Sequence, residues 1–164
     1  MNDDAACMPR KIISGGQTGA DLGGLVGARR AGIPTGGFAA GGYRTERGPQ
    51  EAALRQFGLV PHASAAYPPR TEDNVRHSDA TLIFCTAKAS AGTRMTIEFC
   101  SKHVRPYTVI DPRSDSAVAE VRAFFDQYRP DTLNIAGNRE TVSPGIAAAV
   151  AGIISAAFRA DTEA

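Results

Sequence analysis

The sequence has few cysteines, no excess of one charge and no long hydrophobic run. Its three cysteines form no CxxC pair and are odd in number, which argues against a disulfide framework. With 18 basic and 17 acidic side chains the net charge is +1, so neither a nucleic-acid nor a membrane-surface partner is expected. No apolar stretch reaches the ~18 residues that span a bilayer. The first residues, MNDDAACMPRK, carry acids where a signal peptide needs a basic and then an apolar run. These absences indicate a soluble, cytoplasmic protein.

Several signatures of catalysis and cofactor binding are also missing. The three histidines (His62, His77 and His103) are far apart without ligand spacing, so no metal site is predicted. There is no Walker A loop, no complete GxGxxG and no GxSxG elbow. No Asp or Glu occurs between Leu22 and Thr45, where a dinucleotide-binding fold would place an acid for the ribose. NAD is therefore disfavoured.

What is present is a regular alternation of short β-rich runs and helical stretches. The 164 residues predict one domain over residues 1–164, with an ordered core of about 10–158. Six strands are expected, at residues 10–14, 33–38, 59–60, 80–85, 106–110 and 132–136. Such an alternation is typical of parallel sheets with crossover helices. The sequence therefore predicts an α/β, Rossmann-like three-layer sandwich: a mostly parallel, doubly wound sheet with helices on both faces.

The expected helix starts follow from capping residues and prolines. One helix is predicted to open at Pro49 and to end at Gly58, and a short helix is predicted from Thr71, after a loop. Ser143 and Pro144 read as the cap and first residue of a terminal helix, which is apolar nearly all round. Either the core or a subunit interface would bury that helix, and its small residues favour an interface.

The first polar strand end predicts a ligand site. The residues concerned are Gly15, Gly16, Gln17, Thr18, Gly19 and Asp21. Ligands of open α/β sheets lie at the carboxyl ends of strands, where glycines permit close approach and helix N–H groups attract anions. The alternative is a tight turn in which the glycines serve geometry and Asp21 complements the helix dipole. Gln17 and Thr18 are not required by such a turn, so ligand contact is favoured.

A second and a third strand end carry similar residues. At residues 85–98, Gly92 and Thr93 open a helix that contains Glu98. They form either a second phosphate- or sugar-binding turn, with Glu98 as a polar ligand or general acid/base, or a plain cap with a solvated glutamate. The third, at residues 133–140, contains Asn134, Gly137, Arg139 and Glu140. There, Arg139 either holds an anion or pairs with Glu140.

Two further residues are candidates for the site. Arg44 lies in a glycine-rich loop that acts either as a lid bringing this arginine to a phosphate or as an exposed turn. Asn74 lies near a predicted helix start and is a candidate ligand-binding residue.

The same segments resemble a known family. SGGQTGADLGGL, YRTERGP, RTEDNVRHSDATLIF, AGTRMTIE and LNIAGNRETVSPGI are similar to the family named putative molybdenum carrier proteins. That family is a circularly permuted member of the Rossmann-like SLOG superfamily, which includes lysine-decarboxylase-like proteins. The resemblance covers nearly the whole chain. It implies a Rossmann-like fold, a homo-oligomer, and a pocket for a phosphorylated small molecule that is nucleotide-like or is the molybdenum cofactor (molybdopterin).

The match also has departures. The loop after the second predicted strand has Ala40-Gly41-Gly42, where the family often has Pro-Lys-Gly, so a lysine–phosphate contact is lost or replaced by Arg44. The enzymatic relatives cleave the N-glycosidic bond of nucleoside monophosphates beside a PGGxGT loop, which is incomplete here. The leading hypothesis is therefore a phosphate-binding carrier. A nucleotide hydrolase using Glu98 is the alternative, and a vestigial or partner-serving pocket is a third.

Overall fold

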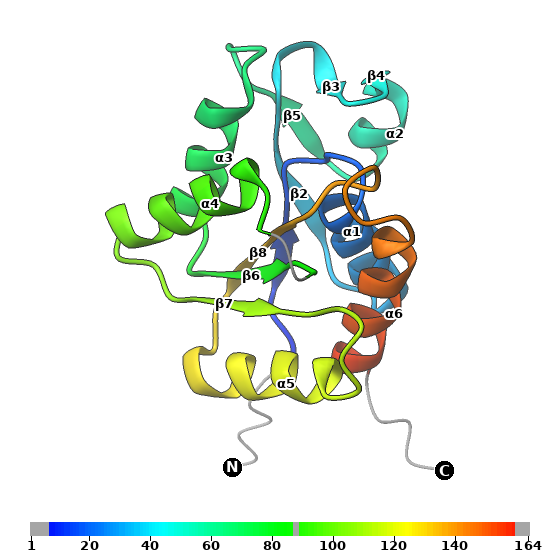
Figure 1. The fold of residues 1–164 in the computed structure, drawn as a ribbon, viewed down its shortest axis with the longest axis vertical. Helices are drawn as coiled ribbons and strands as arrows, with labels where there is room; N and C mark the ends of the chain where they lie inside the picture. Colours follow the sequence, from blue (N-terminus) through cyan, green and yellow to red (C-terminus); the bar gives the residue numbers. More distant parts are fainter. Residues whose placement is uncertain (1–6, 87–88, 160–164) are drawn as a thin grey trace.

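The computed structural model describes residues 7–86 and 89–159, and a sheet of six parallel strands forms its centre (Figure 1). The ends of the chain that the sequence predicts to lie outside the ordered core, 1–6 and 160–164, are outside the described residues. The strand order is β5-β2-β1-β8-β6-β7. The bounds are β1 Lys11–Ile13, β2 Thr35–Ala39, β5 Leu59–Pro61, β6 Ala80–Phe84, β7 Tyr107–Ile110 and β8 Thr132–Gly137. Each lies where a strand is predicted.

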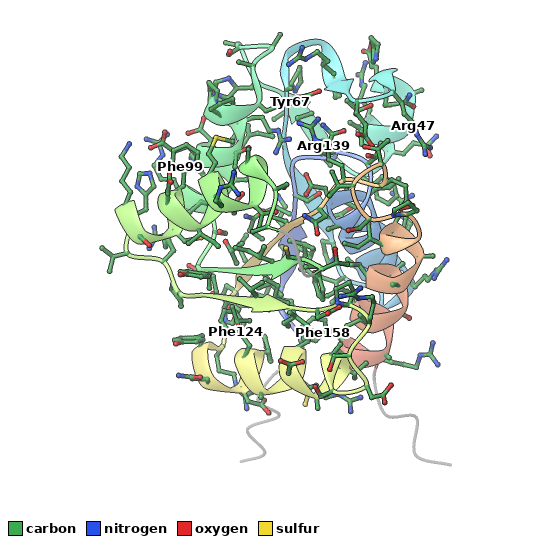
Figure 2. All side chains as sticks on the ribbon, in the orientation of Figure 1. Arg47, Tyr67, Phe99, Phe124, Arg139 and Phe158 are labelled. Carbon is green, nitrogen blue, oxygen red and sulfur yellow. The ribbon has the colours of Figure 1, made fainter. Side chains whose placement is uncertain are left out.

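Helices cover both faces of this sheet, which confirms the predicted three-layer, Rossmann-like fold. Their bounds are α1 Ala20–Arg30, α2 Glu51–Gln56, α3 Tyr67–Arg76, α4 Ala91–Lys102, α5 Ala117–Tyr128 and α6 Ile146–Phe158. The main core joins α1, α5 and α6 to the sheet, whereas α3 and α4 pack together over the other face (Figure 1). The aromatic side chains Phe124 and Phe158 lie in the core between α5 and α6 (Figure 2).

The terminal helix α6 packs against α1 through small residues. A Cβ atom at Gly23 would lie 2.5 Å from the carbonyl oxygen of Ala147, and one at Gly27 would lie 2.7 Å from that of Ala151. Only glycine permits this backbone approach. The core of its own chain therefore buries the apolar face of α6, which is the first of the two alternatives that the sequence left open. No helix within the described ranges has the length and apolar character needed to cross a membrane.

A small hairpin replaces the predicted helix start at Pro49. After the single turn η1 (Gly41–Tyr43), strands β3 (Arg44–Thr45) and β4 (Gly48–Pro49) pair antiparallel. A proline is tolerated on such a short edge strand because no sheet partner needs its missing N–H. The helix α2 consequently begins only at Glu51.

The other two predicted helix starts also differ from the structure. The helix α3 begins at Tyr67, ahead of the predicted Thr71, and places Pro68 and Pro69 in its first turn. Prolines fit there because the first helical N–H groups have no intrahelical acceptor. The helix α6 begins at Ile146, after the predicted Ser143-Pro144 cap.

The order of the strands creates a crevice at the centre of the sheet. From β1 the chain moves outward to β2 and β5, and later returns through β6 and β7 to β8, which pairs with both β1 and β6. The helices that follow β8 and β6 lie on opposite faces of the sheet: α6 packs with α1 on one face, and α4 packs with α3 on the other. In doubly wound sheets ligands bind at this kind of switch point, beyond the carboxyl ends of the strands.

Candidate functional site

A cavity of about 480 Å³ opens beyond the carboxyl ends of β1 and β8, with α3 and α4 as its other walls. This volume lies within the range typical of small-molecule sites. The lining residues that the sequence predicts for the site are Gly15, Gln17, Asp21, Asn74, Gly92, Asn134, Gly137 and Arg139. The structure thus brings together residues from all three polar strand ends.

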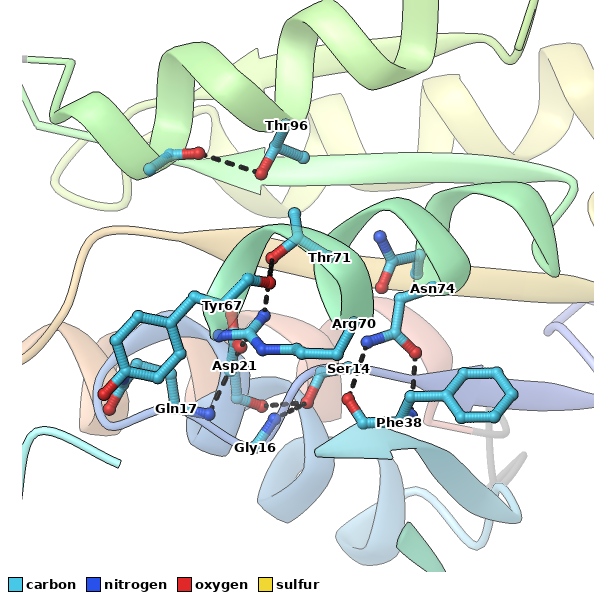
Figure 3. A network of polar contacts seen from close by, with 12 residues as sticks. Ser14, Gly16, Gln17, Asp21, Phe38, Tyr67, Arg70, Thr71, Asn74 and Thr96 are labelled. Carbon is cyan, nitrogen blue, oxygen red and sulfur yellow. Dashed lines mark hydrogen bonds and ion pairs between the residues drawn. The ribbon is translucent and has the colours of Figure 1, made fainter. Parts of the chain in front are cut away.

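The glycine loop after β1 uses its own backbone N–H groups. The Gly16 N–H donates to Ser14 Oγ at 3.2 Å, and the Gln17 N–H donates to Asp21 Oδ2 at 3.2 Å (Figure 3). The Thr18 N–H donates to the side-chain oxygen of Gln17 at 3.0 Å. These three groups are therefore not available to an anion, contrary to the expectation that N–H groups at this strand end attract one.

The glycines of this loop have different roles. A Cβ atom at Gly15 would lie 2.1 Å from Nη1 of Arg70, so this glycine makes room for the arginine. At Gly16, which has φ of +69°, a Cβ atom would lie 2.7 Å from the core side chain of Leu59. Gly19, with φ of +83°, faces backbone atoms of residues 138–140. Gly16 and Gly19 therefore shape the fold and do not line the cavity.

Asp21 and Arg70 form a buried ion pair at one side of the cavity. Arg70 Nη1 lies 3.8 Å from Asp21 Oδ2, and the two side chains are 10% and 7% exposed. Burial raises the pKa of Asp21, although the Arg70 charge and the Gln17 N–H act to lower it. Burial likewise lowers the pKa of Arg70, against the attraction of Asp21. Because both side chains are buried, each charge is stabilised by the opposite charge of its partner.

Three cavity-lining side chains each keep one buried polar atom without a hydrogen-bond partner. They are Nε2 of Gln17, Nε of Arg70 and Oδ1 of Asn134. The Gln17 amide is oriented by its oxygen, which accepts from the backbone N–H groups of Thr18 and Glu46. The Asn134 amide donates from Nδ2 to Thr81 Oγ1 at 3.3 Å. Two donors and one acceptor thus remain for a ligand.

The start of α4 contributes less than predicted. Ser90, and not Thr93, is the N-cap, and its Oγ accepts the Thr93 N–H at 3.3 Å. Gly92 lines the cavity, but Thr93 is buried against Asn138, whose Nδ2 donates to Thr93 Oγ1 at 3.4 Å. Glu98 is exposed on α4 and is not a lining residue. The structure therefore does not place Glu98 where a general acid/base would act on a bound ligand.

At the end of β8, Arg139 and Glu140 have separate roles. Arg139 lines the cavity. Glu140 instead accepts hydrogen bonds from the backbone N–H groups of Gly145 at 2.6 Å and Ala147 at 3.0 Å. It therefore caps α6 from outside the helix, where a negative charge is favourable. Within the part of the chain that the structure describes, no ion pair joins Arg139 to Glu140.

Asn74 and Arg44 also differ from the prediction. Asn74 lines the cavity, but its amide pairs with the backbone of Phe38, accepting from the N–H and donating to the carbonyl, both at 2.9 Å (Figure 3). Its main contact is therefore structural. Arg44 is not a lining residue; its guanidinium lies 4.4 Å from the centre of the Tyr67 ring, which does line the cavity.

Sequence reasoning missed Glu46 as well as Tyr67 and Arg70. The Glu46 carboxylate accepts from the hydroxyl of Thr18 and from Thr141, whose Oγ1 lies 2.6 Å from Oε2. Partial burial acts to raise the pKa of Glu46, but these hydrogen bonds outweigh it and hold the pKa below its ordinary value. Glu46 thereby fixes the hairpin loop to the segments that follow β1 and β8. The Thr18 hydroxyl therefore has a structural role.

No obvious metal centre accompanies the cavity. In residues 7–86 and 89–159, no group of three or more His, Cys, Asp or Glu side chains is placed to hold a metal ion. Its polar lining instead consists of amides, hydroxyls, arginines and Asp21. This set suits hydrogen-bonded recognition of an organic or anionic ligand better than direct ligation of a cation.

Comparison with known proteins gives two matches. The model of a family described as "Circularly permutated YpsA SLOG family" matches residues 12–158. A solved structure described as that of a putative molybdenum carrier protein from Syntrophus aciditrophicus SB is 33% identical, with a TM-score of 0.83. The match covers 93% of this chain and 96% of that one. Among curated proteins none matches.

Proposed function

Because this chain belongs to the circularly permuted YpsA SLOG family, we propose that it is a small-molecule-binding protein that carries a phosphate-bearing ligand in the central cavity. The ligand is nucleotide-like or is the molybdenum cofactor. The solved relative is described as a putative molybdenum carrier protein, which supports the second possibility. The proposal includes a homo-oligomer in the cytoplasm, on the strength of the family resemblance and the balanced charge of the sequence.

The observation that carries this proposal is the set of unpaired polar atoms of Gln17, Arg70 and Asn134 around one cavity. Leaving a buried donor or acceptor unsatisfied costs roughly 1–3 kcal/mol for each group. A ligand that pairs them would recover this free energy on binding. A ring amide offers an oxygen acceptor beside an N–H donor, as guanine and pterin rings do. Such an edge would take the Gln17 donor and the Asn134 acceptor.

These residues fit the molybdenum cofactor through its organic part. Gln17 and Asn134 would hold the pterin ring, and the arginines would hold the phosphate. When bound, the cofactor would supply the metal together with its ligands, so no protein side chain has to coordinate molybdenum. The hydrolase alternative is not favoured, because Asp21 is the only carboxylate among the described lining residues and it is paired with Arg70.

The test is native mass spectrometry of the freshly purified protein, followed by denaturation and identification of the released small molecule. Gln17→Glu keeps the oxygen that accepts the Thr18 and Glu46 N–H groups but removes the Nε2 donor. Gln127→Glu makes the same change on the exposed surface of α5 and is the matched control. We expect a phosphorylated ligand in the wild type and in Gln127→Glu, and its loss from Gln17→Glu.

Two outcomes contradict the proposal. An empty wild-type protein would exclude a tight carrier. A Gln17→Glu variant that retains the ligand in full would show that the unpaired donor is not part of the binding site.

A further inference from the structure

Three arginine side chains surround the aromatic ring of Tyr67. The guanidinium carbon of Arg44 lies 4.4 Å from the ring centre, that of Arg139 lies 4.8 Å away and that of Arg70 lies 5.4 Å away. They come from the hairpin after β2, the loop after β8 and the first turns of α3. Figure 2 shows Tyr67 and Arg139 close together on the side of the molecule that holds the hairpin. We call these four residues the arginine cluster.

The positive charge of the arginine cluster is only partly neutralised. Arg70 has Asp21 as its carboxylate partner at 3.8 Å. Neither Arg44 nor Arg139 has a carboxylate within ion-pair distance among residues 7–86 and 89–159. Cation–π contact with Tyr67 compensates part of the mutual repulsion. An anion placed among the three guanidiniums would remove the remainder.

One atom of the cluster, Nε of Arg70, is a buried donor that such an anion could pair with. Arg70 is 9% exposed, and its Nε is buried with no acceptor, although its Nη1 already serves Thr71 and Asp21. Gly15 holds this position open, since a Cβ there would overlap the guanidinium. Planar guanidiniums bind the oxygens of phosphate in charge-assisted hydrogen bonds.

We propose that the arginine cluster is the subsite for the terminal phosphate of the ligand. This rests on the proposed function. It replaces the glycine loop after β1 as the place of the anion, because the Gly16, Gln17 and Thr18 N–H groups already bond to Ser14, Asp21 and Gln17. The cluster borders a cavity of about 480 Å³, far larger than one oxyanion requires. The anion is therefore the phosphomonoester end of a larger molecule whose ring reaches toward Asn134. A free oxyanion such as phosphate or molybdate is the other source of the same chemistry.

Isothermal titration calorimetry of the full chain tests this inference by comparing the affinities for GMP and for guanosine, since the two ligands differ only in the phosphate. Arg139→Gln should weaken GMP binding about tenfold to a hundredfold, as expected for a charged hydrogen bond, and leave guanosine binding unchanged. Arg44→Gln should weaken it by no more than about fivefold, because Arg44 is exposed. The control is Arg47→Gln, in the same hairpin and away from Tyr67 (Figure 2), which should change neither.

The outcomes separate this subsite from the proposed function. If GMP and guanosine weaken equally in Arg139→Gln, or if neither weakens, the subsite is overturned while ligand binding stands. Titrations with inorganic phosphate and with molybdate test whether the arginine cluster binds a free oxyanion instead. Binding of either alone that depends on Arg139, without binding of GMP, would support the anion subsite but contradict the nucleotide-like ligand. If none of these probes shows binding that depends on Arg139, the inference is overturned.

Discussion

Replacing Arg70 with methionine removes the guanidinium that faces Asp21 and leaves a buried carboxylate. At the observed 3.8 Å separation, the attraction is about 4 kcal/mol with an effective dielectric constant of ~20. Both side chains are almost fully buried, so solvent screens this attraction little. Breaking a buried pair from one side typically costs about 3–5 kcal/mol. We expect Arg70→Met to lower the free energy of unfolding by about 3–4 kcal/mol near neutral pH.

A double-mutant cycle separates this pair from the other contacts of Arg70. Asp21→Asn removes the carboxylate charge, and in the combined variant no buried charge is left without a partner. The combined variant should therefore recover most of the loss, with a coupling energy of about 3 kcal/mol. Urea denaturation followed by circular dichroism measures all four proteins. A loss under about 1 kcal/mol in Arg70→Met would refute the reasoning, because the pair would then behave like one exposed to solvent.

The pH dependence has a definite sign. Burial already raises the pKa of Asp21 above its ordinary value in the wild type, and loss of Arg70 raises it further. A group whose pKa is higher in the folded state favours folding below its unfolded pKa, and this contribution is lost as the pH rises through the folded pKa. The penalty in Arg70→Met should therefore shrink on acidification as Asp21 becomes neutral. A penalty that grows at low pH would contradict this.

Three further predictions concern structure outside the cavity. Hydrogen bonds from Arg113 lower the pKa of Asp111 from 3.8 to about 2, so its stabilising contribution is present above the unfolded pKa and is lost as the pH falls from there through about 2. By NMR titration, Arg113→Gln should return the pKa toward 3.8. Gly19→Ala should lower the free energy of unfolding by about 2 kcal/mol or more, because φ is +83° and the new Cβ would lie 2.4 Å from a carbonyl oxygen. Gly152→Ala is the control, since Gly152 lies in open space on α6. In the same urea denaturation it should raise the free energy of unfolding by about 0.5–1 kcal/mol. Glu140→Ala should cost about 1 kcal/mol through loss of the α6 cap, and a change in ligand affinity with unaltered stability would instead assign Glu140 to the ligand.

The sequence was sufficient for the six-stranded sheet because its strands fall on short β-rich runs between helical stretches, of which the buried run Ala80–Phe84 is the clearest. Hydrophobic patterning is a local property, and the six strands of the central sheet overlap the predicted ones, whereas the hairpin strands β3 and β4 were not predicted. The start of α3 could not be read in the same way. Two consecutive prolines suggest a loop, and only the helical first turn, where their missing N–H groups are harmless, accommodates both.

The site was predictable in outline but not in its chemistry. Gln17, Asn134 and Arg139 could be placed near one another because they lie near or beyond the carboxyl ends of parallel strands, which share one edge of the sheet. The role of each glycine could not, because it depends on partners that are distant in sequence, such as Leu59 against Gly16. Arg70 carries no local signal either, since its counter-ion Asp21 lies on another helix. Which backbone N–H groups remain available for a ligand is decided by such contacts.

Because the first strand of the sheet pairs with the last, the chain cannot complete its sheet until β8 has been synthesised. Lys11 of β1 is in register with Thr132 of β8, and β8 alone lies between β1 and β6. A nascent chain without β8 therefore holds two separate pieces of sheet, β5-β2-β1 and β6-β7, each with an additional open edge. Pairing between distant segments is slow, and open edges associate with other chains. An emerging chain therefore exposes these open edges to neighbouring chains until β8 emerges.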